Sequence, residues 1–269
     1  MADGPVVVIT GAAGGIGQAL CRRWAREGAR LVMLDVEQEA LEAAAAALRA
    51  GGAEVLALRC DVTRYEDCRD SMDRAVQRFG RIDVMVANAG AVHRSGFADT
   101  DLSVFRRVME VNFHGALHCA KAALPPLRES RGLIVVVSSV AGFAPLYGRS
   151  GYAASKHALH GLFESAGAEL APEGIRVMMV CPSFTRSGFE QRAMGADGVP
   201  VARPRSMVGR LASPEEVADA VVRGAARGKR LLVLSSVGRL TYYLSRLAPG
   251  LYERLMVRRL RAELAAGEP

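Results

Sequence analysis

The chain carries little cysteine, only five residues in 269, at positions 21, 60, 68, 119 and 181. No two of them stand in the Cys-x-x-Cys spacing that is typical of zinc sites and redox-active dithiols. Isolated cysteines in a reducing compartment behave as small buried apolar groups. We therefore expect neither a disulfide nor a metal site.

Histidine is equally scarce, with five residues. His114 and His118 have the spacing of two metal ligands on one helix face, but no carboxylate or cysteine set accompanies them. We expect a structural role for this pair, and likewise for His157 and His160.

The N-terminus lacks the charged segment and apolar core of a secretory signal, because Met1 to Gly4 lead straight into an apolar run. We therefore expect a cytoplasmic protein. A repeat of fixed period is also missing, and no nucleic-acid motif is present, so nucleic acid is not expected as a partner. The net charge of +7 is only weak support for an acidic ligand or a membrane.

Apolar residues, in contrast, are abundant at 50% of the chain, enough for one large α/β domain with a substantial core. Runs rich in Val and Ile recur between longer helical stretches, at 5–10, 31–34, 54–60, 83–87, 132–138, 175–181 and 230–235. This pattern predicts a doubly wound parallel sheet of about seven strands with helices on both faces. We assign residues 1–236 to this domain and 237–269 to a C-terminal helical extension packed on it.

The first apolar run ends directly in Gly11-Ala12-Ala13-Gly14-Gly15-Ile16-Gly17, and the residues from Gln18 to Arg26 follow with a helical pattern. Glycines let the backbone turn tightly and approach a pyrophosphate closely, while the N-terminus of the helix attracts phosphate. A strand, a Gly-rich turn and a helix in this order predict a Rossmann-type dinucleotide site.

Asp35 follows the second apolar run, where an acid that binds ribose is expected. A carboxylate accepts hydrogen bonds from both ribose hydroxyls but repels the additional phosphate of NADP. Val36 comes next, where a basic residue would have held that phosphate. We therefore favour NAD over NADP. Asp35 can also serve as a helix N-cap, and the two roles are compatible.

Tyr152 and Lys156 are four positions apart, which places a phenol and an ammonium on one face of a helix. A tyrosine has a pKa of about 10 and trades protons efficiently near neutral pH only beside a positive charge. The pair therefore indicates acid/base chemistry next to the dinucleotide site.

These features together resemble the short-chain dehydrogenase/reductase family, in its compact single-domain branch, from about Pro5 to Ser236. Thr10 to Gly17 is similar to the family's TGxxxGxG turn, and the interval to Tyr152 selects the second serine of Ser138-Ser139. The resemblance implies a catalytic tetrad of Asn112, Ser139, Tyr152 and Lys156. The cofactor-binding residues that it implies are Gly11, Gly15, Ile16, Gly17, Asp35, Asp61, Val62, Asn88, Ala89, Gly90, Tyr152, Lys156, Pro182 and Thr185.

The family's reaction is hydride transfer between nicotinamide and a carbinol or carbonyl carbon. The resemblance implies that Tyr152 exchanges the substrate proton, that Lys156 lowers the pKa of Tyr152 and holds the nicotinamide ribose, and that Ser139 donates to the substrate oxygen. Asn112 is expected to position a water for proton relay. Structural alternatives remain: Ser139 can cap the segment after its strand, and Asn112 can bridge a helix irregularity.

One position departs from the family pattern, because Ser183 replaces the usual glycine after Pro182. The segment from Ser183 to Met207 is rich in Gly, Pro and Arg and predicts a lid over the substrate. An apolar substrate pocket is expected, to which six residues can contribute: Phe184, Phe189, Met194, Phe143, Leu146 and Tyr147.

The C-terminal extension combines an apolar stripe with positive charge. The stripe consists of Leu240, Leu244, Leu247, Leu251 and Leu255, and six arginines between 239 and 261 face only Glu253 within those bounds. Two short helices of this kind can cover the pocket or lie on an anionic membrane. Packing on the protein's own core or on a partner subunit is the alternative.

We interpret the sequence as an NAD-dependent oxidoreductase that interconverts a secondary alcohol and a ketone on a lipophilic substrate. The alternative is a non-catalytic dinucleotide-binding module or sensor that acts through its basic C-terminal helices. A nucleotide-sugar epimerase or dehydratase would need a larger C-terminal domain. The resemblance implies a homodimer or homotetramer, with helices around 103–128 and 153–170 in the dimer contact.

Overall fold

The computed structural model describes residues 4–201 and 210–265. Seven parallel strands form one sheet in the order β3-β2-β1-β4-β5-β6-β7. Their bounds are β1 Val6–Thr10, β2 Arg30–Asp35, β3 Val55–Arg59, β4 Val84–Ala87, β5 Leu133–Val137, β6 Arg176–Cys181 and β7 Leu231–Val233. The seven strands agree with the seven apolar runs of the sequence.

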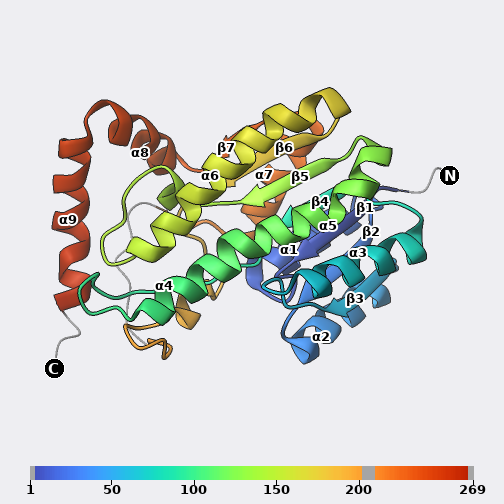
Figure 1. The fold of residues 1–269 in the computed structure, drawn as a ribbon, viewed down its shortest axis with the longest axis horizontal. Helices are drawn as coiled ribbons and strands as arrows, with labels where there is room; N and C mark the ends of the chain where they lie inside the picture. The colour runs from blue at the N-terminus through green and yellow to red at the C-terminus, as the bar shows by residue number, and fades with distance from the viewer. Residues whose placement is uncertain (1–3, 202–209, 266–269) are drawn as a thin grey trace.

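Helices cover both faces of the sheet, as Figure 1 shows. One face packs against α1 (Gly15–Ala25), α2 (Gln38–Ala50) and α7 (Pro214–Ala226). The other packs against α3 (Tyr65–Phe79), α5 (Gly115–Ser130) and α6 (Ser150–Leu170). The predicted Rossmann-type doubly wound fold is confirmed.

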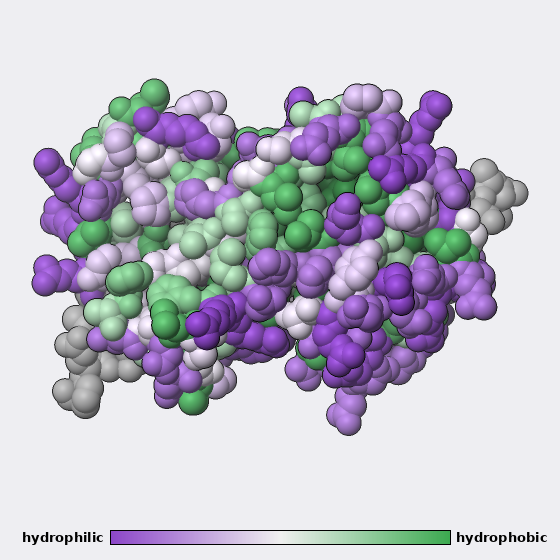
Figure 2. Space-filling model, in the orientation of Figure 1, coloured by the Kyte–Doolittle hydropathy of each residue, from purple (hydrophilic) through white to green (hydrophobic). Residues whose placement is uncertain are grey.

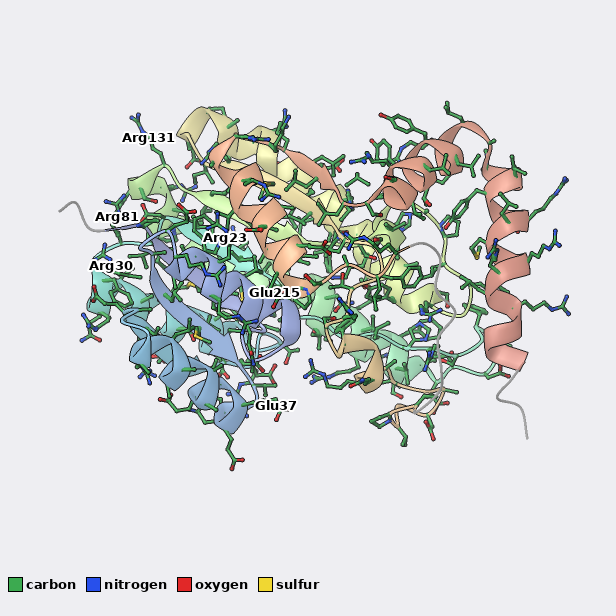
Figure 3. The ribbon with its side chains drawn as sticks, turned by 180° about the vertical axis from the view of Figure 1, so that it is seen from behind. Arg23, Arg30, Glu37, Arg81, Arg131 and Glu215 are labelled. Carbon is green, nitrogen blue, oxygen red and sulfur yellow. The ribbon has the colours of Figure 1, made fainter. Side chains whose placement is uncertain are left out.

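The central strands are apolar throughout because both of their faces are covered. Every side chain of β1, β4 and β5 is buried. On the face seen in Figure 3, α1 and α7 lie side by side, and Arg23 and Glu215 project from these two helices. Arg23 pairs with Asp219 at 2.6 Å and Arg22 with Glu215 at 3.1 Å. These partly exposed pairs lie at the edge of the contact between the two helices.

Helix α1 begins at Gly15, inside the Gly-rich turn, and not at Gln18 as the sequence pattern predicts. The reason is that the Gln18 backbone N–H already donates to the Gly14 carbonyl, at 2.8 Å, which is a regular helical bond. The last glycines of the turn therefore form the N-terminus of the helix, where backbone N–H groups are left without helical partners.

Helix α4 (Leu102–Met109) runs into α5 through a π-helical turn at Glu110–His114. The Gly115 N–H donates to the Glu110 carbonyl five residues earlier, so this turn holds one more residue than an α-helical turn. Such turns often occur at functional sites, and this one carries Asn112.

The chain ends in two helices, α8 (Ser236–Leu247) and α9 (Pro249–Ala265), which stand at one end of the molecule beside the loops of α4 and α6 (Figure 1). Pro249 starts α9, because a proline is tolerated in the first helical turn but cannot continue α8. Among the described residues, no helix has the length and apolar content that a membrane crossing requires.

Candidate active site

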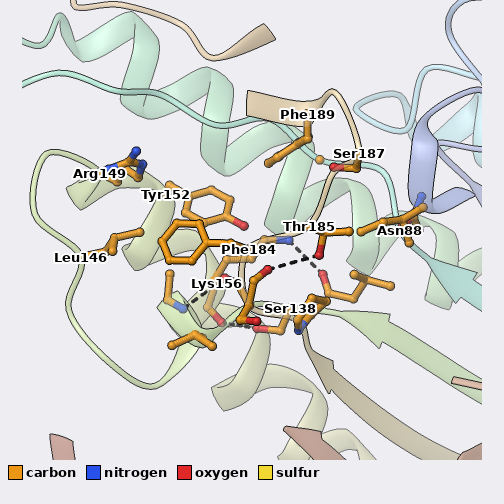
Figure 4. A pocket seen from close by; sticks show the side chains of 18 of the residues that line it. Asn88, Ser138, Leu146, Arg149, Tyr152, Lys156, Phe184, Thr185, Ser187 and Phe189 are labelled. Atoms are coloured by element: carbon orange, nitrogen blue, oxygen red, sulfur yellow. Dashed lines mark hydrogen bonds between the residues drawn. The ribbon is translucent and has the colours of Figure 1, made fainter. Parts of the chain in front are cut away.

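A cavity of about 510 Å³ opens at the carboxyl ends of β1, β2, β4, β5 and β6. Ligands of open α/β sheets bind at this end, where the strand order reverses between β1 and β4. Of the residues predicted to be catalytic or to bind the cofactor, only Asn112 does not line the cavity. Figure 4 shows its centre, with Tyr152, Phe184 and Lys156 close together.

The Gly-rich turn fits a ligand that binds to bare backbone. Gly11 has φ +63°, and a Cβ atom on it would lie 2.9 Å from the Ala89 Cα. A Cβ atom on Gly17 would overlap the Gly11 carbonyl oxygen. No other residue type fits these two positions without a shift of the backbone. The turn, the free N–H groups of α1 and the cavity above them together suit a dinucleotide pyrophosphate.

Thr10 and Asn88 lock this turn to the end of β4. The Thr10 hydroxyl accepts the backbone N–H groups of Asn88 and Ala89, each at 3.0 Å. The Asn88 amide donates to the carbonyls of Thr10, at 2.9 Å, and Gly11, at 3.2 Å. The side chain of Asn88 therefore holds the shape of the cradle, and the residue lines the cavity.

Asp35 lines the cavity at the end of β2. One carboxylate oxygen accepts the Ala13 N–H at 2.9 Å, and the other accepts the Glu37 N–H at 3.1 Å. The predicted alternative as a helix N-cap is wrong, because Glu37 occupies the N-cap position of α2. Each oxygen keeps a lone pair for a ribose hydroxyl.

Asp61 and Val62 line the same end of the cavity, after β3. Burial, the largest influence, raises the pKa of Asp61, but hydrogen bonds from Thr63 and the charges of Arg107 and Arg59 outweigh it, and the net shift is downward. The Thr63 hydroxyl donates to the carboxylate at 2.7 Å. Asp61 is therefore ionised and its carboxylate is fixed in orientation.

Tyr152 and Lys156 lie on the first turns of α6, as their spacing predicts. The Lys156 Nζ is 5.7 Å from the centre of the Tyr152 ring and donates to the Val137 carbonyl at 2.9 Å. Burial lowers the pKa of Lys156 to about 8. The ammonium is still charged at neutral pH, beside the phenol.

His93 fixes the start of α6. Its Nε2 accepts the Gly151 N–H at 2.9 Å, and its Nδ1 contacts the Ser95 hydroxyl at 3.2 Å. Burial, with a smaller influence from Arg149, lowers the pKa of His93 to about 4, so the ring is neutral and remains an acceptor. The helix turn that carries Tyr152 is thus held from outside the cavity.

Ser139 follows β5 and caps the short 3-10 turn Val140–Gly142, as the structural alternative predicts. Its hydroxyl oxygen accepts the Ala141 N–H at 3.1 Å. Because the oxygen is the acceptor in this bond, the hydroxyl proton remains available for a substrate oxygen in the cavity. The capping role and the catalytic role are therefore compatible.

Asn112 is buried behind the cavity, and its side chain is fully engaged by the protein. Its oxygen accepts the Ala91 N–H at 2.7 Å, and its nitrogen donates to the Ala91 carbonyl at 2.9 Å and the Ser155 hydroxyl at 2.8 Å. Asn112 lies in the π-helical turn, but its side chain bonds to Ala91 and Ser155 outside that turn and does not bridge the irregularity itself. Its place in a catalytic tetrad and its relation to a water both stay predictions.

The segment after β6 supplies the opposite wall. Pro182, Ser183, Thr185 and Ser187 line the cavity, and the last part of the predicted lid at 183–207, from 202 to 207, lies outside the described residues. Of the six predicted pocket residues, Leu146, Phe184 and Phe189 line the cavity. The other three were wrongly predicted: Phe143 packs against Tyr242, Tyr147 borders a separate hollow, and Met194 pairs with His93.

Helices α8 and α9 complete the cavity on the side away from the Gly-rich turn. Their lining residues are mainly apolar, and they are Val237, Gly238, Leu240, Thr241, Leu244, Tyr252, Leu255, Met256, Arg259 and Leu260. The sequence stripe contains three of them. Tyr252 and Met256 were missed, although they follow Leu251 and Leu255 by one position and could have been found from a wider helical face.

Three further arginines that the sequence analysis did not predict line the cavity, Arg107, Arg149 and Arg192. Arg149 is buried three positions before Tyr152, and Arg192 lies on the exposed end of the segment after β6. None of the three has a sequence signal, since each is one arginine among many in a basic chain.

Comparisons with known proteins agree with this geometry. A family model described as short chain dehydrogenase matches residues 5–196. The chain is 36% identical over 276 residues to the 11-beta-hydroxysteroid dehydrogenase A of Sesamum indicum, which covers 99% of this chain and 78% of that protein.

Two solved structures share the fold over most of their length. A short chain dehydrogenase/reductase from Burkholderia phymatum, in complex with NAD, has a TM-score of 0.83 and 26% identity, covering 93% of this chain and 95% of that one. An alcohol dehydrogenase from Thermococcus sibiricus, complexed with 5-hydroxy-NADP, has a TM-score of 0.75 and 28% identity, covering 87% and 97%.

Proposed function

The chain belongs to the short-chain dehydrogenase/reductase family of oxidoreductases, and we propose that it interconverts a secondary alcohol and a ketone on a lipophilic substrate, with NAD preferred over NADP. One observation carries this proposal. A single cavity joins the Gly-rich turn, the Tyr152–Lys156 pair and the apolar side chains of α8 and α9.

The nicotinamide, when bound, supplies or accepts the hydride. Tyr152 exchanges a proton with the substrate oxygen through its phenol. Lys156 holds a positive charge beside that phenol, and its remaining N–H groups are free for a ribose hydroxyl after the bond to Val137. The Ser139 hydroxyl donates a hydrogen bond to the substrate oxygen, whose negative charge grows during reduction.

Asn112 acts on this chemistry from behind. Its amide joins Ala91, after β4, to Ser155, which lies between Tyr152 and Lys156 on α6. The Ser155 hydroxyl in turn donates to the Tyr152 carbonyl at 2.8 Å. The loop after β4 and the catalytic helix are thus held in one register.

The preference for NAD is supported by the end of β2. Asp35, Val36 and Glu37 all line the cavity there, and the two carboxylates disfavour an additional phosphate on the ribose. The two similar solved structures carry one cofactor of each kind, so the preference rests on these three residues.

The lipophilic substrate is supported by the wall that faces Tyr152. Leu146 and Phe184 come from the body of the protein, and Leu244, Leu255 and Met256 come from the C-terminal helices. An apolar wall with one polar, reactive end suits a large secondary alcohol. A relative named as a hydroxysteroid dehydrogenase is consistent with a polycyclic substrate of this kind.

We further propose that the outer surface of α8 and α9 contacts an anionic membrane. Tyr243, Leu247 and Leu251 do not line the cavity and are 61%, 82% and 51% exposed, and they share these helices with six arginines. An exposed apolar row beside positive charge is typical of helices that lie on a lipid surface. The same helices line the cavity, so a lipophilic substrate would have a short path from lipid to Tyr152.

A homodimer is proposed through α5 and α6. Figure 2 shows hydrophobic side chains gathered in the middle of the face that these helices occupy, whereas hydrophilic ones dominate over α2 and α3. Sedimentation velocity is the direct measurement of the assembly.

The oxidoreductase proposal is tested by screening NADH oxidation against short and long ketones and aldehydes. Tyr152→Phe should lose turnover by about a thousandfold, because it removes the proton donor, while NADH affinity stays close to wild type. Near-normal kcat of Tyr152→Phe on a confirmed substrate would contradict the role of the phenol. A wild type that binds NADH and turns over nothing would favour the sensor alternative.

A further inference from the structure

The segment at 183–192, here called the strap, crosses the cavity from the catalytic side to the Gly-rich turn. Figure 4 shows Phe189 pointing from the strap toward Tyr152, and the two ring centres are 6.2 Å apart. At Ser187 the strap meets α1: a Cβ atom on Gly15 would lie 2.7 Å from the Ser187 carbonyl oxygen and 2.8 Å from its Cα. The strap therefore rests directly on the first turn of the helix.

Arg192, at the end of the strap, reaches the same turn. An ideal Cβ atom on Gly14 would lie 3.5 Å from the Arg192 Nη2, and both residues line the cavity. Within residues 4–201 and 210–265, no hydrogen bond or ion pair engages the Arg192 side chain. Its neighbour on the strap, Arg186, does not line the cavity.

Two positive groups therefore face each other across a small part of the cavity. One is the N-terminus of α1, with its free N–H groups and the positive end of the helix dipole, and the other is the Arg192 guanidinium. This arrangement is unfavourable without an anion between them and favourable with one, because a guanidinium and backbone N–H groups both donate to phosphate oxygens.

We propose that Arg192 is a cofactor-binding residue that holds the pyrophosphate of the dinucleotide against the Gly-rich turn from the side of the substrate. This inference rests on the proposed function, because it needs a dinucleotide in the cavity. The strap then contacts both parts of the site: Arg192 and Ser187 lie against the Gly-rich turn, and Phe189 lies beside Tyr152. Bound pyrophosphate thus holds the strap closed beside Tyr152.

Equilibrium titration separates Arg192 from a general effect of charge. NADH and ADP-ribose, which both contain the pyrophosphate, and adenosine, which contains no phosphate, are titrated into the purified full chain by calorimetry, with adenosine measured by competition. Arg192→Ala should lower the affinity for NADH and for ADP-ribose by about tenfold, which is the effect of one charge-assisted hydrogen bond. The affinity for adenosine should stay unchanged. Arg192→Lys should recover part of the loss, and Arg186→Ala is the matched control with wild-type affinities.

Salt gives a second readout that does not depend on turnover. The affinity of the wild type for ADP-ribose should fall with ionic strength more steeply than that of Arg192→Ala, because one positive contact is lost. Equal NADH affinities of wild type and Arg192→Ala, or an equal loss for adenosine, would overturn the inference and leave the proposed function intact. A wild type that binds neither NADH nor NADPH would overturn both.

Discussion

The two halves of the cavity are built by different means. In the cofactor half, the backbone and short polar side chains set the shape: Thr10, Asn88 and Asp35 all bond to main-chain groups of the Gly-rich turn or its neighbours. In the substrate half, α8, α9 and the strap present apolar side chains, and rows of leucines remain exposed on the outer side.

This difference decides how each half responds to change. A glycine in contact with backbone tolerates no side chain, and an acceptor of a main-chain N–H has few replacements. An apolar wall needs only volume, so substitutions there change the fit of the substrate by small steps. Single substitutions in the cofactor half should therefore abolish cofactor binding, whereas those in the substrate half should change substrate binding by small steps.

The largest effect is expected for Gly17→Ala in the cofactor half. The new Cβ atom would overlap the Gly11 carbonyl oxygen, so the turn must open and NADH affinity should fall by about a hundredfold or more. Fluorescence titration with NADH and a thermal melt measure affinity and folding together.

The matched control is Gly161→Ala on α6, where a Cβ atom meets no atom within 4 Å. This variant should keep its NADH affinity and gain up to about 1 kcal/mol of stability from helix propensity. Comparable NADH affinities of the two variants would show that the turn is not the rigid element we describe.

Lys156→Met should stabilise the protein while it removes activity. The pKa of Lys156 in the folded state, about 8, lies below its ordinary value, so the buried charge destabilises the fold fully below pH 8. The pKa shift corresponds to about 3 kcal/mol of destabilisation, which Lys156→Met removes. Loss of the hydrogen bond to the Val137 carbonyl costs about 1 kcal/mol, so the free energy of unfolding should rise by about 2 kcal/mol at pH 7.

The gain from Lys156→Met should shrink as the pH rises from 8 toward 10.5, because the wild type then loses its buried charge. Denaturant unfolding at pH 6.5, 8 and 9.5 measures it, with Lys121→Met, on the exposed face of α5, as the control. A gain that is the same at every pH would mean that packing, and not charge, is responsible.

Val36→Arg should improve kcat/KM with NADPH by about tenfold, because it brings a positive charge to the ribose end without disturbing the bonds of Asp35. The additional substitution Asp35→Ser should reduce the preference for NAD over NADP further, but it should also loosen the Gly-rich turn that Asp35 holds. Glu39→Arg, on the first turn of α2 and outside the cavity, is the control for added charge. A wild type that prefers NADPH contradicts our assignment.

The smallest effect is expected in the substrate half. Leu244→Ala removes a cavity-lining side chain and should raise KM about fivefold for a long apolar ketone, with little change for a short one. Leu247→Ala, on the same helix but 82% exposed, should leave both KM values alone and weaken binding to anionic vesicles. If the two variants behave alike in both assays, the side chains that line the cavity and those that contact the membrane do not have separate roles.

The same contrast explains what the sequence could predict. The strand runs, the glycines and the Tyr152–Lys156 spacing are local patterns with one structural solution, and the structure has them where they were expected. The second role of Asp35, as acceptor for Ala13, could not be predicted because it depends on how two segments meet across the sheet.

The substrate half was harder to predict for the same reason. Phe143 and Tyr147 lie in the right loop but face away from the cavity, since an irregular loop has no periodicity to orient its side chains. The sequence does not reveal the role of Arg192, because Arg192 comes close to Gly14 only when the strap is folded back onto the Gly-rich turn. The apolar content of the sequence indicated a lipophilic wall, but only the folded structure shows which residues form it.

The strand order also governs how the protein folds as it is synthesised. β1 lies between β2 and β4, and it can pair with β2 early, yet the Val6 N–H finds its partner in Asp83, 77 residues later. At roughly 5–20 residues per second, one edge of β1 stays open for about 4 to 15 seconds. Gly11 cannot meet Ala89 before then, so the cofactor cradle forms only when the ribosome has delivered β4, and until that moment an apolar strand edge is exposed to other chains.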